Sequence, residues 1–140
     1  MQGAWFEGQF KTDFEFVRGL LDSQGIEWKR THLIKGWFRD TLTADLLEEF
    51  QIRKTNLIFI DCDMYLSAKE ALDFCAPLIK DRCVIVFDDW ASNGLDKKDL
   101  GEKKAFEEFL AENPRISVSP FGRYACKDME NGRIFQLTVS

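Results

Sequence analysis

Two runs of large apolar residues each end on a pair of aspartates. NLIFI (56–60) is followed by Asp61 and Asp63, and CVIVF (83–87) is followed by Asp88 and Asp89. Four carboxylates in one place repel one another and raise each other's pKa values unless a cation lies between them. A site made only of oxygen ligands suits Mg²⁺, Mn²⁺ or Ca²⁺ rather than zinc. A single aspartate at a strand end more often caps a helix or lies in water, but two pairs favour a functional site.

The two apolar runs predict the strands that would hold these acids. Both runs are apolar at every position, which is typical of parallel strands covered on both faces by helices. If the strands are neighbours, their tips lie on the order of 5 Å apart. Asp63 points the same way as Asp61 if the backbone between them stays extended. Ligands of such sheets bind outside the carboxyl ends of the strands. The aspartates come directly after the predicted strands and would lie at these ends.

The remaining elements are expected from capping residues and hydrophobic spacing. Helices are predicted from Thr12 with Glu15 as its capping partner, from Thr43, from Ser67 with Glu70, and over residues 100–113. THLIKG (31–36) is predicted to be a short strand, and the last part of the chain (115–139) is strand-like with a hairpin turn at DMENG (128–132). The pattern predicts one α/β domain over residues 1–140. Its sheet is Rossmann-like and mostly parallel, with helices on both faces and an antiparallel hairpin at the C-terminal end.

Composition excludes several classes of protein. The 140 residues carry a net charge of −5, which argues against a nucleic-acid partner. No apolar run approaches the ~20 residues of a membrane span, and the start lacks the pattern of a signal peptide. The four cysteines form no C-x-x-C pair and there is a single histidine, so a zinc site is disfavoured. We expect a cytoplasmic protein with free thiols and no membrane or nucleic-acid partner.

FIDCDM (59–64) could also belong to a haloacid-dehalogenase-type phosphatase, in which an aliphatic strand ends in Asp-x-Asp. That family usually has Thr or Val where this chain has Tyr65. It also places a lysine and further elements before its later acidic pair, whereas one helix length separates the two pairs here. The spacing disfavours a phosphatase.

Three blocks in this order resemble the macrocin O-methyltransferase family. They are GWFRDTL (36–42), DCDMYLSAKEALDFCAPLI (61–79) and VIVFDDW (84–90). The resemblance covers nearly the whole chain and implies a class I methyltransferase fold that uses S-adenosylmethionine and Mg²⁺ to methylate a hydroxyl of a sugar or other small molecule.

The resemblance also implies roles for particular residues. The expected metal ligands are Asp61, Asp63, Asp88 and Asp89. The expected cofactor-binding residues are Gly36, Trp37 and Phe38 beside the adenine, together with Asp61. No general base is identified, and His32 is expected to have a core or surface role.

Family members also have an earlier β-α-β unit with a glycine-rich cofactor loop, and no G-x-G occurs in this chain. The resemblance therefore implies a partial domain that binds S-adenosylmethionine weakly or not at all by itself. Without that unit, residues 57–60 present a bare apolar edge, and we expect a homodimer or larger oligomer through this edge and residues before Gly36. The alternative function is a catalytically inactive, self-associating module.

Overall fold

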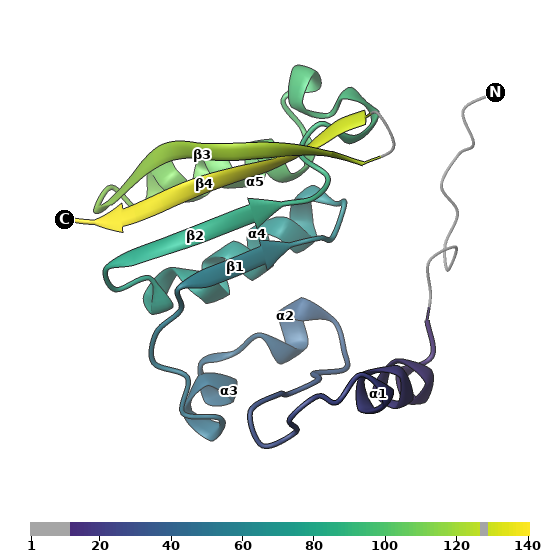
Figure 1. Cartoon of the computed structure of the whole chain (residues 1–140). Coiled ribbons are helices and arrows are strands. Elements are labelled where there is room, and N and C mark those ends of the chain that lie inside the picture. Colours follow the sequence, from purple (N-terminus) through teal and green to yellow (C-terminus); the bar gives the residue numbers. More distant parts are fainter. Residues whose placement is uncertain (1–11, 127–128) are drawn as a thin grey trace. The chain divides into compact units, whose positions relative to one another are not determined.

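The computed structural model describes residues 12–126 and 129–140 (Figure 1). The chain separates into two compact units, one up to Gly36 and one from Trp37 onward. Each unit is described by itself below. None of the helices in the described part of the chain is long and apolar enough to cross a membrane.

The first unit contains helix α1 (Phe14–Ser23). Its N-cap is Asp13, whose side chain accepts hydrogen bonds from the N–H groups of Glu15 and Phe16 at 3.0 and 3.1 Å. The prediction of Thr12 as the cap was therefore wrong by one residue. The strand predicted over residues 31–36 was also wrong, because this segment has no strand conformation and no described strand pairs with it.

The second unit is built on a four-stranded sheet in the order β1-β2-β4-β3. The strands are β1 (Leu57–Ile60), β2 (Arg82–Phe87), β3 (Ile116–Cys126) and β4 (Met129–Val139). β1 and β2 are parallel, whereas β4 runs antiparallel to both β2 and β3. The mixed α/β fold with a C-terminal antiparallel hairpin is thus confirmed. The expectation of a mostly parallel sheet was wrong for the described strands, because β1 and β2 form a parallel pair whereas the other two pairs are antiparallel. The turn was predicted too far along the chain, because residues 129–132 belong to β4, and residues 127 and 128 lie outside the described residues.

Helices α4 (Tyr65–Cys75) and α5 (Gly101–Glu112) cover one face of the sheet (Figure 1). Ile85 and Phe87 of β2 are fully buried beneath them, and Phe87 packs against Phe106 of α5 with ring centroids 4.9 Å apart. The predicted cap of α4 at Ser67 was wrong. The carbonyl of Met64 already accepts the N–H of Ala68, so the helix begins before Ser67.

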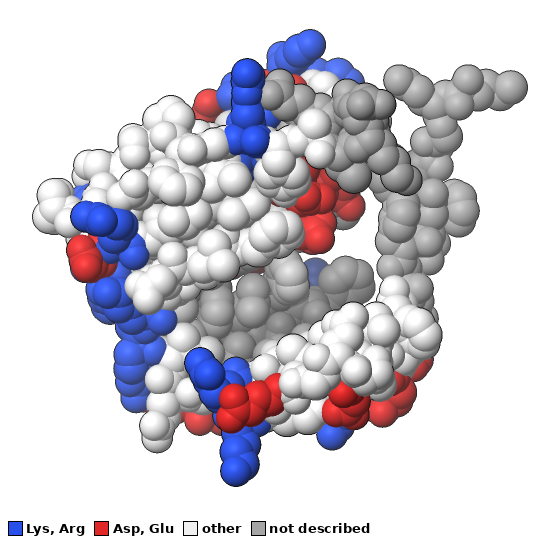
Figure 2. Space-filling view, viewed as in Figure 1, with Lys and Arg blue, Asp and Glu red and all other residues white. Residues whose placement is uncertain are grey.

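Two short helices, α2 (Phe38–Thr41) and α3 (Ala44–Glu49), precede β1. A helix was predicted from Thr43, and Thr43 is the N-cap of α3. The sheet face away from α4 and α5 is made mainly of uncharged residues (Figure 2). On that face Leu57 and Phe59 are 63% and 57% exposed. No described strand pairs with the second edge of β1.

Candidate metal centre

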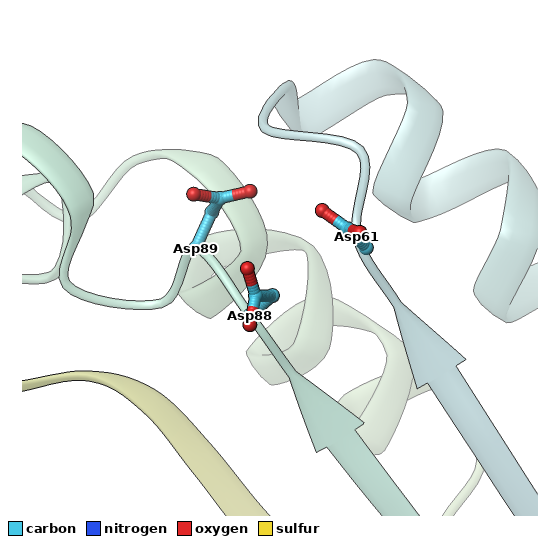
Figure 3. Close-up of side chains that lie close together, drawn as sticks. All are labelled: Asp61, Asp88 and Asp89. Carbon is cyan, nitrogen blue, oxygen red and sulfur yellow. The ribbon is translucent and has the colours of Figure 1, made fainter. Parts of the chain in front are cut away.

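Three aspartates converge at the carboxyl ends of β1 and β2. Asp61 follows β1 directly, and Asp88 and Asp89 follow β2. Ile60 and Phe87 are partners in the parallel register, so the next residues of the two strands lie side by side. Asp61, Asp88 and Asp89 each offer a carboxylate oxygen within 4.8 Å of the others, and the three side chains border one space (Figure 3). The predicted meeting of the two acid pairs is confirmed for these three.

Asp63 takes a different position from the one expected. Its φ of +52° turns the backbone into the left-handed region, so the extended geometry assumed from the sequence was wrong. Asp63 is not among the three residues whose oxygens gather within 4.8 Å. Its carboxyl group nevertheless lies close enough to that of Asp89 to raise the pKa of Asp89.

Electrostatic repulsion is concentrated in this cluster. Burial, followed by the charges of Asp88 and Asp63, raises the pKa of Asp61. The pKa of Asp89 rises to about 7, mainly through burial and then through the hydrogen bond and charge of Asp63. The negative charges of Asp61 and Asp89 therefore cost free energy in the folded protein, and a bound cation would offset that cost.

A buried glutamate supports the cluster from α5. Glu102 is 0% exposed, and its Oε2 accepts a hydrogen bond from the N–H of Asp89 at 3.0 Å, while its Oε1 has no hydrogen-bond partner among the described residues. Burial, and then the charge of Asp89, raises the pKa of Glu102 to about 8. Sequence reasoning missed this residue. Its signal was a charged side chain on the same helical stripe as Phe106 and Phe109.

Tyr124 of β3 was also missed. Its hydroxyl donates a hydrogen bond to Oδ1 of Asp88. Burial, and then this hydrogen bond, raises the pKa of Tyr124, so the phenol remains a donor at neutral pH. Nothing in the sequence spacing links Tyr124 to Asp88, because strand β4 lies between their strands.

The cofactor role expected for Gly36, Trp37, Phe38 and Asp61 stays a prediction. Gly36 ends the first unit, with a φ of +149°, whereas Trp37 and Phe38 begin the second. Trp37 is 72% exposed. Phe38 lines a cavity of about 410 Å³ together with Leu47, Phe74 and others, and Asp61 is not among its lining residues.

Comparison with known proteins identifies a family for the chain. A family model described as a methyltransferase domain matches residues 9–90. None of the curated proteins compared with the chain matches it.

Two solved structures share the fold. An O-methyltransferase from Bacillus cereus, in complex with SAH, is 19% identical with a TM-score of 0.66, and the match covers 89% of this chain and 57% of that one. A putative O-methyltransferase from Klebsiella pneumoniae is 18% identical with a TM-score of 0.60, over 90% of this chain and 56% of that one. The chain thus spans little more than half the length of either. Its family match and its acids at the ends of β1 and β2 lead to one conclusion: the chain belongs to the methyltransferase domain family.

Proposed function

We propose that this chain is part of an O-methyltransferase that uses S-adenosylmethionine and Mg²⁺, of the macrocin type, with a small-molecule hydroxyl as acceptor. The observation that carries the metal dependence is the meeting of Asp61, Asp88 and Asp89 at the ends of two parallel strands. The methyl donor is supported by the methyltransferase family match and by the SAH in the structure of the Bacillus cereus protein.

The donor set fits a hard divalent cation. The three clustered side chains supply only carboxylate oxygens, which Mg²⁺ and Ca²⁺ prefer. Burial and mutual repulsion raise the pKa values of Asp61 and Asp89, and a divalent cation bound between them would favour their ionised forms. Asp63, which contacts Asp89, is proposed as a further ligand.

In this proposal Asp61, Asp88 and Asp89 would hold the cation near the ends of β1 and β2, and the acceptor hydroxyl would bind beside it. A bound Mg²⁺ supplies Lewis-acid chemistry, which polarises a hydroxyl and lowers its pKa. Glu102 and Tyr124 fix Asp89 and Asp88 through hydrogen bonds, so these ligands need little reorganisation.

No G-x-G motif occurs in the chain, so the proposed cofactor contacts are those at the adenine end. We propose that Gly36, Trp37 and Phe38 border the adenine and that Asp61 also contributes to cofactor binding.

Calorimetric titration of the chain with Mg²⁺, and with S-adenosylhomocysteine in the presence and absence of Mg²⁺, tests the proposal. Wild-type chain should bind Mg²⁺, and Asp61→Asn combined with Asp88→Asn should abolish binding. Asp81→Asn is the control, because it makes the same Asp to Asn change just before β2, at the opposite end of that strand from Asp88. Equal Mg²⁺ binding by the double variant and the control would refute the proposed site.

A second candidate function is self-association as a catalytically inactive module. The specific observation is the exposed pair Leu57 and Phe59 on β1, together with the unpaired edge of that strand. An exposed apolar edge strand promotes pairing with another chain. Light scattering at low micromolar concentration should report a dimer or larger assembly that Phe59→Lys weakens. A monomeric wild-type chain would rule out this candidate.

A further inference from the structure

Tyr124 reaches the acid cluster across an intervening strand. It lies on β3, and the hydroxyl to carboxylate contact joins it to Asp88 just after β2. The sheet order places β4 between these two strands. The ring must therefore pass over the backbone of β4 to make this contact.

Gly132 of β4 leaves the space for that ring. Tyr124 and Gly132 are partners in the β3–β4 register, and the neighbouring Arg133 is the partner of Phe87, which precedes Asp88. A Cβ added at Gly132 would lie 2.5 Å from Tyr124 Cδ1 and nearer still to two other ring carbons. Real Cβ atoms essentially never come within 3.0 Å of another heavy atom, so no larger residue fits there without moving the ring.

The glycine is required by the ring and not by its own backbone, because Gly132 is not among the glycines with positive φ. The backbone beside it is also held in place. The N–H of Ala91, two residues after Asp89, donates to the carbonyl of Asn131 at 3.1 Å. The loop that carries the acids and the strand that carries Gly132 are thereby joined.

The contact restricts a carboxylate that belongs to the proposed metal site. A hydroxyl on Oδ1 of Asp88 limits rotation of the side chain and fixes where its oxygens lie relative to Asp61 and Asp89. Hydrogen bonds of this kind to metal-binding carboxylates tune affinity, and their loss typically costs 10–100-fold.

We infer that Tyr124 is a positioning residue of the metal centre, and that Gly132 is required because it lets the Tyr124 ring reach Asp88. This inference rests on the proposed metal site. The inference gives the C-terminal hairpin of β3 and β4 a role in positioning a metal ligand. This hairpin lies outside the residues matched by the methyltransferase family model.

Titration of the full chain with Mn²⁺ alone, followed by calorimetry and by electron paramagnetic resonance of the free ion, tests the inference. Tyr124→Phe removes one oxygen atom and Gly132→Ala displaces the ring. Each should weaken Mn²⁺ binding about tenfold. Both substitutions remove the same contact between Tyr124 and Asp88. The double variant should therefore bind Mn²⁺ with an affinity no lower than that of the single variant with the lower affinity.

The matched control is Tyr65→Phe. The sequence contains two tyrosines, Tyr65 and Tyr124. The hydroxyl of Tyr65 also donates a hydrogen bond to a carboxylate, at 2.6 Å from Oε2 of Glu108. Glu108 is not among the clustered acids. The control removes the same atom and the same kind of hydrogen bond, so its Mn²⁺ affinity should equal that of the wild type.

The possible results separate the two proposals. If wild-type chain binds Mn²⁺ and Tyr124→Phe binds it equally well, the positioning role is refuted while the metal site stands. If the wild type binds no Mn²⁺ at millimolar concentration, both proposals fail. If the losses of Mn²⁺ binding free energy in Tyr124→Phe and Gly132→Ala add up in the double variant, the role given to Gly132 is refuted. If Gly132→Ala does not fold, Tyr124→Phe against Tyr65→Phe still decides the role of Tyr124.

Discussion

Replacing Glu102 by glutamine should stabilise the metal-free protein at neutral and alkaline pH. Glu102 is fully buried, and only one of its two carboxylate oxygens is hydrogen-bonded among the described residues. Gln has the same shape and keeps an oxygen that can accept the N–H of Asp89. The substitution therefore removes a buried charge without leaving a cavity.

The magnitude follows from the raised pKa. The pKa of Glu102 rises from its ordinary value of 4.5 to about 8, so the folded state binds a proton more tightly than the unfolded state does. The free energy of unfolding must then fall as pH rises from 4.5 to 8. At about 1.36 kcal/mol per pKa unit, the loss from this residue has an upper bound of about 5 kcal/mol. Glutamine does not titrate and should recover at least about 2 kcal/mol of it at pH 8.5.

Urea unfolding in EDTA at pH 4.5, 7 and 8.5, followed by tryptophan fluorescence, measures the effect. The variant should match the wild type at pH 4.5 and exceed it increasingly at the two higher values. It should still lose some stability between pH 4 and 7, because the pKa of Asp89 is also raised, to about 7. Added Mg²⁺ should reduce the difference between variant and wild type at pH 8.5, because the cation offsets the local negative charge.

Glu107→Gln is the matched control. It makes the same chemical change on the same helix, at a side chain that is 54% exposed and paired with Lys103 at 3.5 Å. It should alter the free energy of unfolding by less than about 0.5 kcal/mol at every pH. A Glu102→Gln variant that is equally destabilised at pH 4.5 and pH 8.5 would refute the reasoning. That result would mean that the carboxylate makes a favourable contact whose value exceeds the cost of its burial.

Three further predictions concern the metal, the core and the cofactor. Millimolar Mg²⁺ should raise the melting temperature by binding the folded state, and Asn at both Asp61 and Asp88 should abolish that rise; an unchanged melting temperature for the wild type would contradict it. Leu72→Ala, at a fully buried position of α4, should lower the free energy of unfolding by about 3 kcal/mol in chemical denaturation, and a loss below about 1 kcal/mol would show that the core closes around the gap. Calorimetry should find weak or no binding of S-adenosylhomocysteine to this chain alone, because a helix N-terminus after a glycine-rich loop normally receives its carboxylate, and micromolar affinity would disprove this expectation.

The sequence predicted the part of the site that depends on strand order. Asp61 and Asp88 could be placed together because each follows an uninterrupted apolar run, and parallel neighbours bring their carboxyl ends to one edge. The helix over residues 100–113 and the C-terminal strands were likewise readable from local spacing. These features depend on periodicity within one segment or on one right-handed crossover, so little tertiary information is needed.

Tertiary structure decided the details that depend on a single backbone angle or on whether a strand has a hydrogen-bonding partner. The backbone at Asp63 is not extended because its φ is positive, and no sequence pattern predicted this. Residues 31–36 have the composition of a strand, but a strand requires hydrogen-bonding partners, and no described strand pairs with them. The full apolarity of residues 57–60 predicted burial on both faces. Ile58 and Ile60 are buried, whereas Leu57 and Phe59 are exposed.

The sequence by itself therefore determined the fold class and which acids could meet, since both follow from the order and polarity of short segments. Only the folded chain shows that Glu102 lies buried against Asp89 and that Tyr124 passes over Gly132 to Asp88. The first contact joins residues that are 13 positions apart in the chain, and the second joins residues that are 36 positions apart. They exist because the packing of α5 and the register of β3 on β4 bring the side chains to the ends of β1 and β2, and both depend on how segments distant in the chain meet.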